Sequence, residues 1–153
     1  MSQNKVDGFQ RGYAVEIGPQ IEALLAEGQF VTLQISGDSM RPTLKPLRDA
    51  AVLAKMDTWP PQKGDILFFR SERSPSGYAL HRVRKVTDAG PMMNGDAQNW
   101  VEGPIAREQV LAKAVALLRK GKPVDIEKSG SRAYVRLWGI TRPIRHPLFA
   151  VWR

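Results

Sequence analysis

A short segment around Ser39 carries the residue types of a serine nucleophile. Ser39 follows Gly37 and Asp38, and it precedes Met40 and Pro42. A catalytic serine needs an exposed hydroxyl on a tight turn, a base nearby, and backbone N–H groups directed at the developing oxyanion. Gly37 permits unusual backbone dihedrals, and Pro42 stiffens the exit from the turn. Gly-Asp-Ser turns are also common for structural reasons, so this segment alone does not identify a nucleophile.

The candidate base is a histidine. The chain has two histidines, His81 and His146, and no cysteine. This composition argues against a zinc site, a disulfide and a cysteine nucleophile, and we expect neither a metal nor a cofactor. An imidazole with an ordinary pKa of ~6.5 suits general-base work near neutrality. A histidine held by hydrogen bonds for structural reasons is the alternative for His81.

Lys85 is a second candidate base. It lies four residues after His81 on the same face of an expected strand. At ~3.3 Å per residue the two side chains would be about 13 Å apart, so they cannot both serve one serine. A desolvated lysine could act as the base instead of the histidine.

A carboxylate follows in the segment Asn94-Gly95-Asp96. Asn-Gly is a strong turn signal, so a purely structural role is the alternative. A carboxylate at this turn could orient a histidine and stabilise its protonated form, as in other catalytic triads. Asp96 is therefore a candidate third member of the site.

Four segments occur in an order that resembles the signal peptidase I and LexA-type serine peptidase superfamily. The match extends from about Val31 to Leu118. The four segments are Gly37–Leu44 (the nucleophile box), Lys63–Phe69 (a Gly-Asp-hydrophobic strand box), Leu80–Val83 (the box of the base) and Asn94–Asn99 (a Gly-Asp box). Each is weak alone, and the four in order are a strong signal.

The resemblance implies roles for individual residues. A histidine at the base position is similar to the signal peptidases of the endoplasmic reticulum and archaea, whereas bacterial-type members have lysine there. Ser39 would attack the scissile carbonyl, His81 would take its proton, and Asp96 would be the third member. Glu102 corresponds to the second acid of that branch and is the alternative carboxylate. The Ser39 N–H would be the oxyanion donor, on a turn supported by its neighbours Gly37, Asp38 and Met40.

Three departures distinguish the chain from the membrane-bound members. It has no transmembrane anchor, it lacks the large inserted β domain of some bacterial members, and its Gly-Asp box continues with Ala97 instead of Asn. The first ten residues contain no apolar run typical of a secretory signal, and no run approaches the ~18 residues of a membrane span. The chain resembles small stand-alone bacterial relatives, and we expect a cytoplasmic protein, at most peripheral to a membrane.

The elements that must position these residues are mostly strands. Apolar spacing predicts a helix over residues 13–27 that stops at Gly28, with Pro19 as an alternative start. Short β-type runs separated by turn clusters predict a compact, mostly β domain. The expected strands cover residues 30–35, 51–54, 66–69, 78–86 and 111–118, and residues 121–130 read as a hinge or hairpin.

Alternation along residues 78–86 predicts two strand faces. One face would carry Leu80, Arg82, Arg84 and Val86, and the other Ala79, His81, Val83 and Lys85. The 153 residues favour one domain. We divide it into an N-terminal helical extension (1–28), a peptidase core (29–128) and a basic aromatic tail (129–153), irregular or helical, that packs on or next to the core.

The net charge of +8 points to an anionic partner or to a solvated surface. The tail holds five arginines and no acid. Its Arg, Trp and Phe side chains suit a peripheral contact with a membrane, could stack on nucleic acid, or could pack on the core. We expect a peptide or protein substrate and no nucleic-acid partner.

Two other functions are alternatives to a peptidase that acts on a separate substrate. A self-cleaving regulator would need a cleavage site ahead of the nucleophile, but Ala89-Gly90 follows Ser39, and the first 28 residues can barely hold one helix. A catalytically idle binding module that uses the basic tail is the second alternative.

Overall fold

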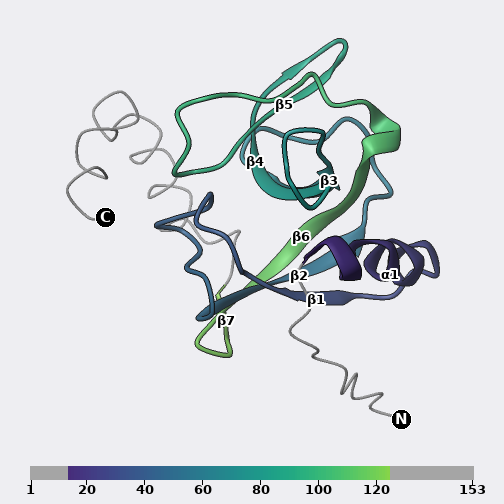
Figure 1. Cartoon of the computed structure of the whole chain (residues 1–153). Helices are drawn as coiled ribbons and strands as arrows, with labels where there is room; N and C mark the ends of the chain where they lie inside the picture. Colours follow the sequence, from purple (N-terminus) through teal and green to yellow (C-terminus); the bar gives the residue numbers. More distant parts are fainter. Residues whose placement is uncertain (1–13, 125–153) are drawn as a thin grey trace.

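The chain folds into one antiparallel sheet of seven strands with one α-helix, among the residues that the computed structural model describes, 14–124 (Figure 1). The elements are α1 (Ala14–Ala26), β1 (Val31–Gln34), β2 (Asp49–Lys55), β3 (Ile66–Arg70), β4 (Tyr78–Thr87), β5 (Gly90–Asn94), a short 3₁₀ turn (Arg107–Gln109), β6 (Val110–Arg119) and β7 (Lys122–Val124). The mostly β class is confirmed. The proposed tail, 129–153, lies outside the described residues, as does His146.

The strand order is β1-β2-β6-β3-β4-β5, and β7 pairs with β6. The late strand β6 therefore inserts between two earlier groups of strands, β1-β2 and β3-β4-β5, bonding to β2 on one side and to β3 on the other. In Figure 1, β6 runs from the part of the sheet that holds β1 and β2 to the part that holds β3, β4 and β5. The two parts carry different residues of the site, as described below.

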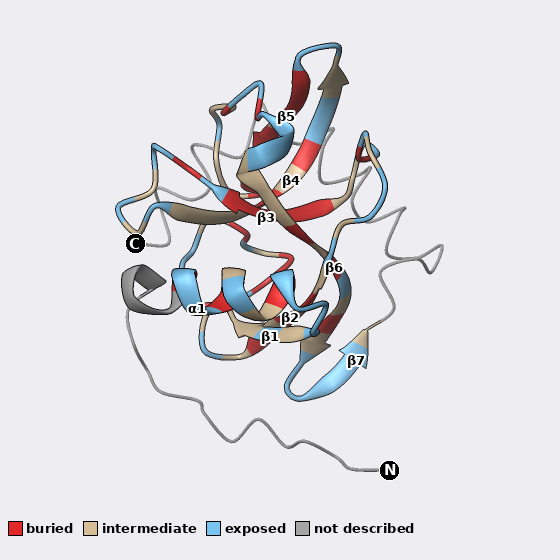
Figure 2. Ribbon diagram, turned by 90° about the vertical axis from the view of Figure 1, so that its right-hand side faces the viewer, coloured by how far each residue is buried: buried red, intermediate tan, exposed pale blue. Residues whose placement is uncertain are grey.

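Side chains from the two faces of the sheet form two apolar clusters. The larger one includes Ile21 and Leu25 of α1 packed with Phe68 of β3. The smaller one includes Leu67 and Phe69 of the same strand. β3 is thus covered on both faces, which explains why its sequence is a continuous apolar run and does not alternate. Figure 2 shows α1 lying against β1 and β2 with its outer side exposed.

The helix begins earlier than the Pro19 alternative. α1 contains Pro19 in its interior and ends before Gly28, which has a φ of 79°. Close packing explains the glycine before Pro19, because a Cβ atom at Gly18 would lie 2.0 Å from the ring of Tyr78. The tyrosine hydroxyl donates to Glu22 at 2.7 Å, so the helix is fixed to β4 by a close approach and a hydrogen bond.

Two details of the sheet differ from the sequence predictions. The register of β4 shifts between Val83 and Lys85, which marks a bulge. Ala79, Val83 and Val86 consequently all contact the smaller cluster, so the prediction that Val86 faces away from Val83 was wrong. β5 was also missed, because its Gly90-Pro91 start carries residues that are rare in strands. The polar segment after β6 was expected to form a hinge or hairpin. The structure shows a hairpin there: Lys120 and Gly121 connect β6 to β7, which ends at the last described residue, Val124.

Candidate active site

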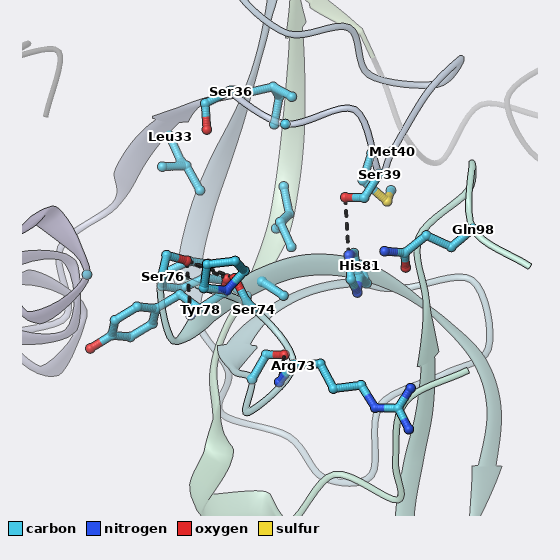
Figure 3. A pocket seen from close by; sticks show the side chains of 18 of the residues that line it. Leu33, Ser36, Ser39, Met40, Arg73, Ser74, Ser76, Tyr78, His81 and Gln98 are labelled. Atoms are coloured by element: carbon cyan, nitrogen blue, oxygen red, sulfur yellow. Dashed lines mark hydrogen bonds between the residues drawn. The ribbon is translucent and has the colours of Figure 1, made fainter. Parts of the chain in front are cut away.

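Ser39 and His81 lie together, although 41 residues separate them in the chain. The Oγ atom of Ser39 is 3.2 Å from Nε2 of His81 (Figure 3). Ser39 belongs to the loop between β1 and β2, and His81 lies on β4 opposite Leu67 of β3. The separation is within the range expected for a nucleophile and its general base in the absence of substrate.

The loop that holds Ser39 is anchored on both sides of the serine. Met40 and Leu44 are 2 % and 1 % exposed and belong to the larger apolar cluster. Asp38 forms an ion pair of 2.5 Å with Arg41. These contacts place the serine between a buried residue and a solvent-facing turn, so the hydroxyl is held while it remains accessible.

The glycine that packs closely against the nucleophile is Gly95, and Gly37 does not adopt the left-handed backbone that its type permits. Gly37 is absent from the described glycines with positive φ, and a Cβ atom there would meet open space. A Cβ atom at Gly95 would lie 2.6 Å from the carbonyl oxygen of Ser39. The same carbonyl accepts the N–H of Ala97 at 2.8 Å. The Gly95 turn therefore abuts the nucleophile, which no residue with a side chain would allow without displacement.

His81 is buried and neutral. It is 5 % exposed, and its ring meets Phe69 and Trp100 edge-on at centroid distances of 5.9 and 6.4 Å. Burial lowers the pKa of His81 from 6.5 to about 4, while the negative charge of Asp96 acts in the opposite direction. At neutral pH the imidazole is therefore uncharged and able to accept a proton at one ring nitrogen.

This environment predicts a pH dependence of stability. The pKa of His81 is lower in the folded protein than the 6.5 of the unfolded chain, so protons bind preferentially to the unfolded state. The full stability is present above pH 6.5 and declines as the pH falls towards 4, by about 3 kcal/mol in total. Urea unfolding of the wild type and of His81→Gln at several pH values measures this effect.

The variant is the control for all other titrating groups, including His146. We expect the difference in unfolding free energy between the two proteins to change between pH 7 and pH 4, in the direction that favours the variant at low pH. Parallel pH curves for the two proteins would contradict the buried neutral histidine.

The sequence suggested that Asp96 orients His81. The structure shows no hydrogen bond between the two side chains. Its carboxylate accepts from Thr43 Oγ1 at 2.6 Å and from two nitrogens of Arg82 at 2.9 Å each. The Nδ1 atom of His81 is buried and has no hydrogen-bond partner among residues 14–124. Asp96 therefore acts on the imidazole through its charge and joins the nucleophile loop to β4.

The remaining candidates have other partners. Glu102 is buried, and both its oxygens accept from the hydroxyl of Ser71, at 2.7 and 2.9 Å. It is therefore not hydrogen-bonded to His81 either. Lys85 is exposed and lies beyond the bulge of β4. The described part of the chain thus supplies a serine–histidine pair with two carboxylates that are engaged elsewhere.

A cavity of about 290 Å³ opens beside the pair. One wall is the chain from Leu33 through Ser39, and the other is the chain from Ser74 through His81, with Gly18 and Ile21 of α1 also lining it. Among the strands of residues 14–124, β1 pairs with β2 alone. In the same range β4 pairs with β5 only from Arg82 onward, so its stretch Tyr78–His81 is bonded to β3 alone. Two strand stretches with unpaired edges therefore line the cavity.

Sequence reasoning missed three residues that line this cavity. Gln98 accepts the N–H of Gly95 through Oε1 at 3.0 Å, and its amide points toward His81 (Figure 3). The guanidinium of Arg73 lies 5.1 Å from the ring centroid of Trp100. Gln98 lies inside the Gly-Asp box, which was a usable signal. Arg73 and Trp100 lie in loops and carried no signal of their own.

In residues 14–124, no cluster of three or more His, Cys, Asp or Glu side chains could hold a metal ion. No helix within the same range is long and apolar enough to cross a membrane. In comparisons with known proteins, no family model, no curated protein and no solved structure matches the chain.

Proposed function

We propose that this chain is a serine endopeptidase that uses a Ser39–His81 dyad. The observation that carries the proposal is the 3.2 Å separation between Ser39 Oγ and His81 Nε2 at the edge of a cavity. The resemblance of four sequence segments to signal-peptidase-type enzymes is independent support. A hydroxyl next to a neutral imidazole is the arrangement that nucleophilic acyl transfer requires.

The reaction would proceed in two acyl-transfer steps. Ser39 Oγ attacks the scissile carbonyl while its proton passes to Nε2 of His81. The imidazolium then gives that proton to the leaving amine, and an acyl-enzyme remains. A water molecule, deprotonated by the same Nε2, hydrolyses the ester and releases the acid. This sequence needs Nε2 as an acceptor in the free protein, and so the proton on Nδ1.

In this mechanism two groups would stabilise the oxyanion. One is the backbone N–H of Ser39, the donor that follows from the resemblance. The other is the side-chain amide of Gln98, whose oxygen is held by Gly95, so that its nitrogen is free to face the cavity. Side-chain amides serve this purpose in other serine peptidases.

The unpaired strand edges support a peptide substrate in an extended conformation. A peptide in the cavity could bond to the edge of β1 or to Tyr78–His81 of β4, as in other cases of strand addition. The apolar lining from Leu33, Met40 and Leu80 would accept small or aliphatic side chains next to the scissile bond. A leader-like or signal-like peptide meets these requirements.

A serine-directed phosphonate probe tests the proposal without knowledge of the substrate. We expect the probe to modify the intact protein once, on Ser39, as located by peptide mass spectrometry. Ser36→Ala is a matched control because Ser36 lines the same cavity. It should retain labelling, whereas Ser39→Ala and His81→Gln should lose it. Labelling that persists in Ser39→Ala, or fails in the folded wild type, would argue against an activated serine.

A further inference from the structure

Basic side chains gather where the β1–β2 loop meets the β6–β7 hairpin. The N–H of Lys120 donates to the carbonyl of Arg48 at 3.2 Å. A guanidinium nitrogen of Arg119 donates to the carbonyl of Thr43, also at 3.2 Å. Asp49 and Arg119 are paired in the sheet. These contacts make one surface of the two segments, and we call Lys45, Leu47, Arg48, Arg119, Lys120 and Lys122 the basic hairpin patch.

Within its own two segments, the positive charge of the patch is offset by one acid. Residues 45–49 and 119–122 contain five cations and one carboxylate, that of Asp49. The Asp49 side chain is fully buried and pairs with Arg48. Lys45, Arg119, Lys120 and Lys122 are all exposed, and Figure 2 shows β7 among the most exposed strands. The patch therefore presents several cations to a partner on one side of the molecule.

An apolar side chain projects from the middle of these cations. Leu47 is 80 % exposed, the largest exposure among the large hydrophobic residues at 14–124. Its φ of 62° lies in the left-handed region, which disfavours a leucine because the Cβ atom comes too close to the backbone carbonyl. Asparagine or glycine would fit this backbone better. Folding gains nothing from an exposed leucine at this position, so the residue points to a partner that buries it.

We infer that the basic hairpin patch binds the surface of an anionic lipid bilayer. Cations attract the anionic headgroups, and an apolar side chain among them can enter the boundary with the acyl chains. The sequence that follows β7 is also basic, since residues 125–153 contain five arginines and one lysine against two acids. Nucleic acid would satisfy the cations but would leave Leu47 without a role, so the bilayer is the better fit.

Vesicle flotation of the full-length protein tests the inference. We expect binding to vesicles of phosphatidylcholine with phosphatidylglycerol, and little binding to phosphatidylcholine alone. Lys120→Glu/Lys122→Glu should weaken binding by roughly tenfold or more, since each cation near an anionic surface contributes about fivefold. Lys63→Glu/Lys85→Glu is the matched control, because it changes net charge equally at exposed sites outside the patch.

Leu47→Asn distinguishes a bilayer from nucleic acid. Asparagine tolerates the left-handed backbone, so the variant should fold as well as the wild type. We expect it to bind vesicles about three- to tenfold more weakly, with unchanged binding to DNA or RNA. The inference fails if the two glutamate pairs weaken vesicle binding equally, or if Leu47→Asn has no effect. Salt-sensitive binding to nucleic acid alone would identify that partner instead. Every assay can use the Ser39→Ala protein, so the outcome does not depend on peptidase activity.

Discussion

Ser39→Ala is expected to lower the rate of peptide cleavage by roughly 10⁴- to 10⁶-fold, and His81→Gln by a similar factor. Alanine removes the attacking oxygen, and glutamine removes the proton acceptor that lies 3.2 Å from it. Because the two groups act as a unit, the double variant should lose no more activity than either single variant. Cleavage of a peptide that the wild type cuts, followed by mass spectrometry, measures the effect.

The fold is the control for this comparison. Within residues 14–124, Ser39 Oγ forms a hydrogen bond to His81 and to no other residue, so Ser39→Ala should retain the wild-type circular dichroism and a similar Tm. Residual cleavage within tenfold of the wild type, in a protein free of contaminating protease, would contradict the dyad. A wild type that cleaves no peptide and resists the phosphonate probe would instead favour a binding module without catalysis.

Asp96→Asn is expected to destabilise the protein by about 3–5 kcal/mol. The Arg82 and Asp96 side chains are 11 % and 7 % exposed, and the variant leaves a buried guanidinium without its counter-charge. It also weakens the bond from Thr43, which holds the nucleophile loop. Urea unfolding of the variant and the wild type at pH 7 gives the difference in unfolding free energy.

Asp38→Asn is the matched control, because it breaks an ion pair whose side chains are 47 % and 75 % exposed. Exposed pairs contribute about 0–1 kcal/mol. If both variants lower the unfolding free energy equally, Asp96 is not the buried ion-pair partner that its contacts indicate. The double variant Arg82→Met/Asp96→Leu removes both charges and should recover most of the stability. If the double variant is stable but no longer cleaves peptides, Asp96 has a role in catalysis in addition to its role in stability.

The sequence predicted elements well where their patterns are local. The helix, the strand at residues 66–69 and the turn at Asn94-Gly95 follow from apolar spacing and turn residues within a few positions. The bulge in β4 could not be predicted, because it depends on how β5 pairs with that strand. The residues that line the cavity were likewise hidden, since Trp100 and Arg73 meet through the fold and not through any spacing.

The sequence predicted which residues belong to the candidate site better than it predicted the hydrogen bonds between them. Sequence motifs named Ser39 and His81, and the structure brings them together. The role of Asp96 required knowledge of its neighbours, because a carboxylate in the turn after β5 can face either a histidine or an arginine. Arg82, adjacent to His81 in sequence, points to the other face of β4 and attracts the carboxylate. Alternation along the strand could have suggested that Arg82 and His81 are alternative partners for the carboxylate. Only a three-dimensional structure shows which of them it contacts.

The insertion of β6 between β2 and β3 has a consequence for the timing of activity during synthesis. Ser39 is attached to β1 and β2, and His81 is attached to β3 and β4. No pairing joins these two groups of described strands except through β6. A ribosome releases the chain from its N-terminus, so residues 110–119 emerge after the nucleophile and the base. A nascent chain would hold both groups before the strand that joins their two parts of the sheet, so we expect the proposed dyad to be aligned only after β6 has emerged and paired.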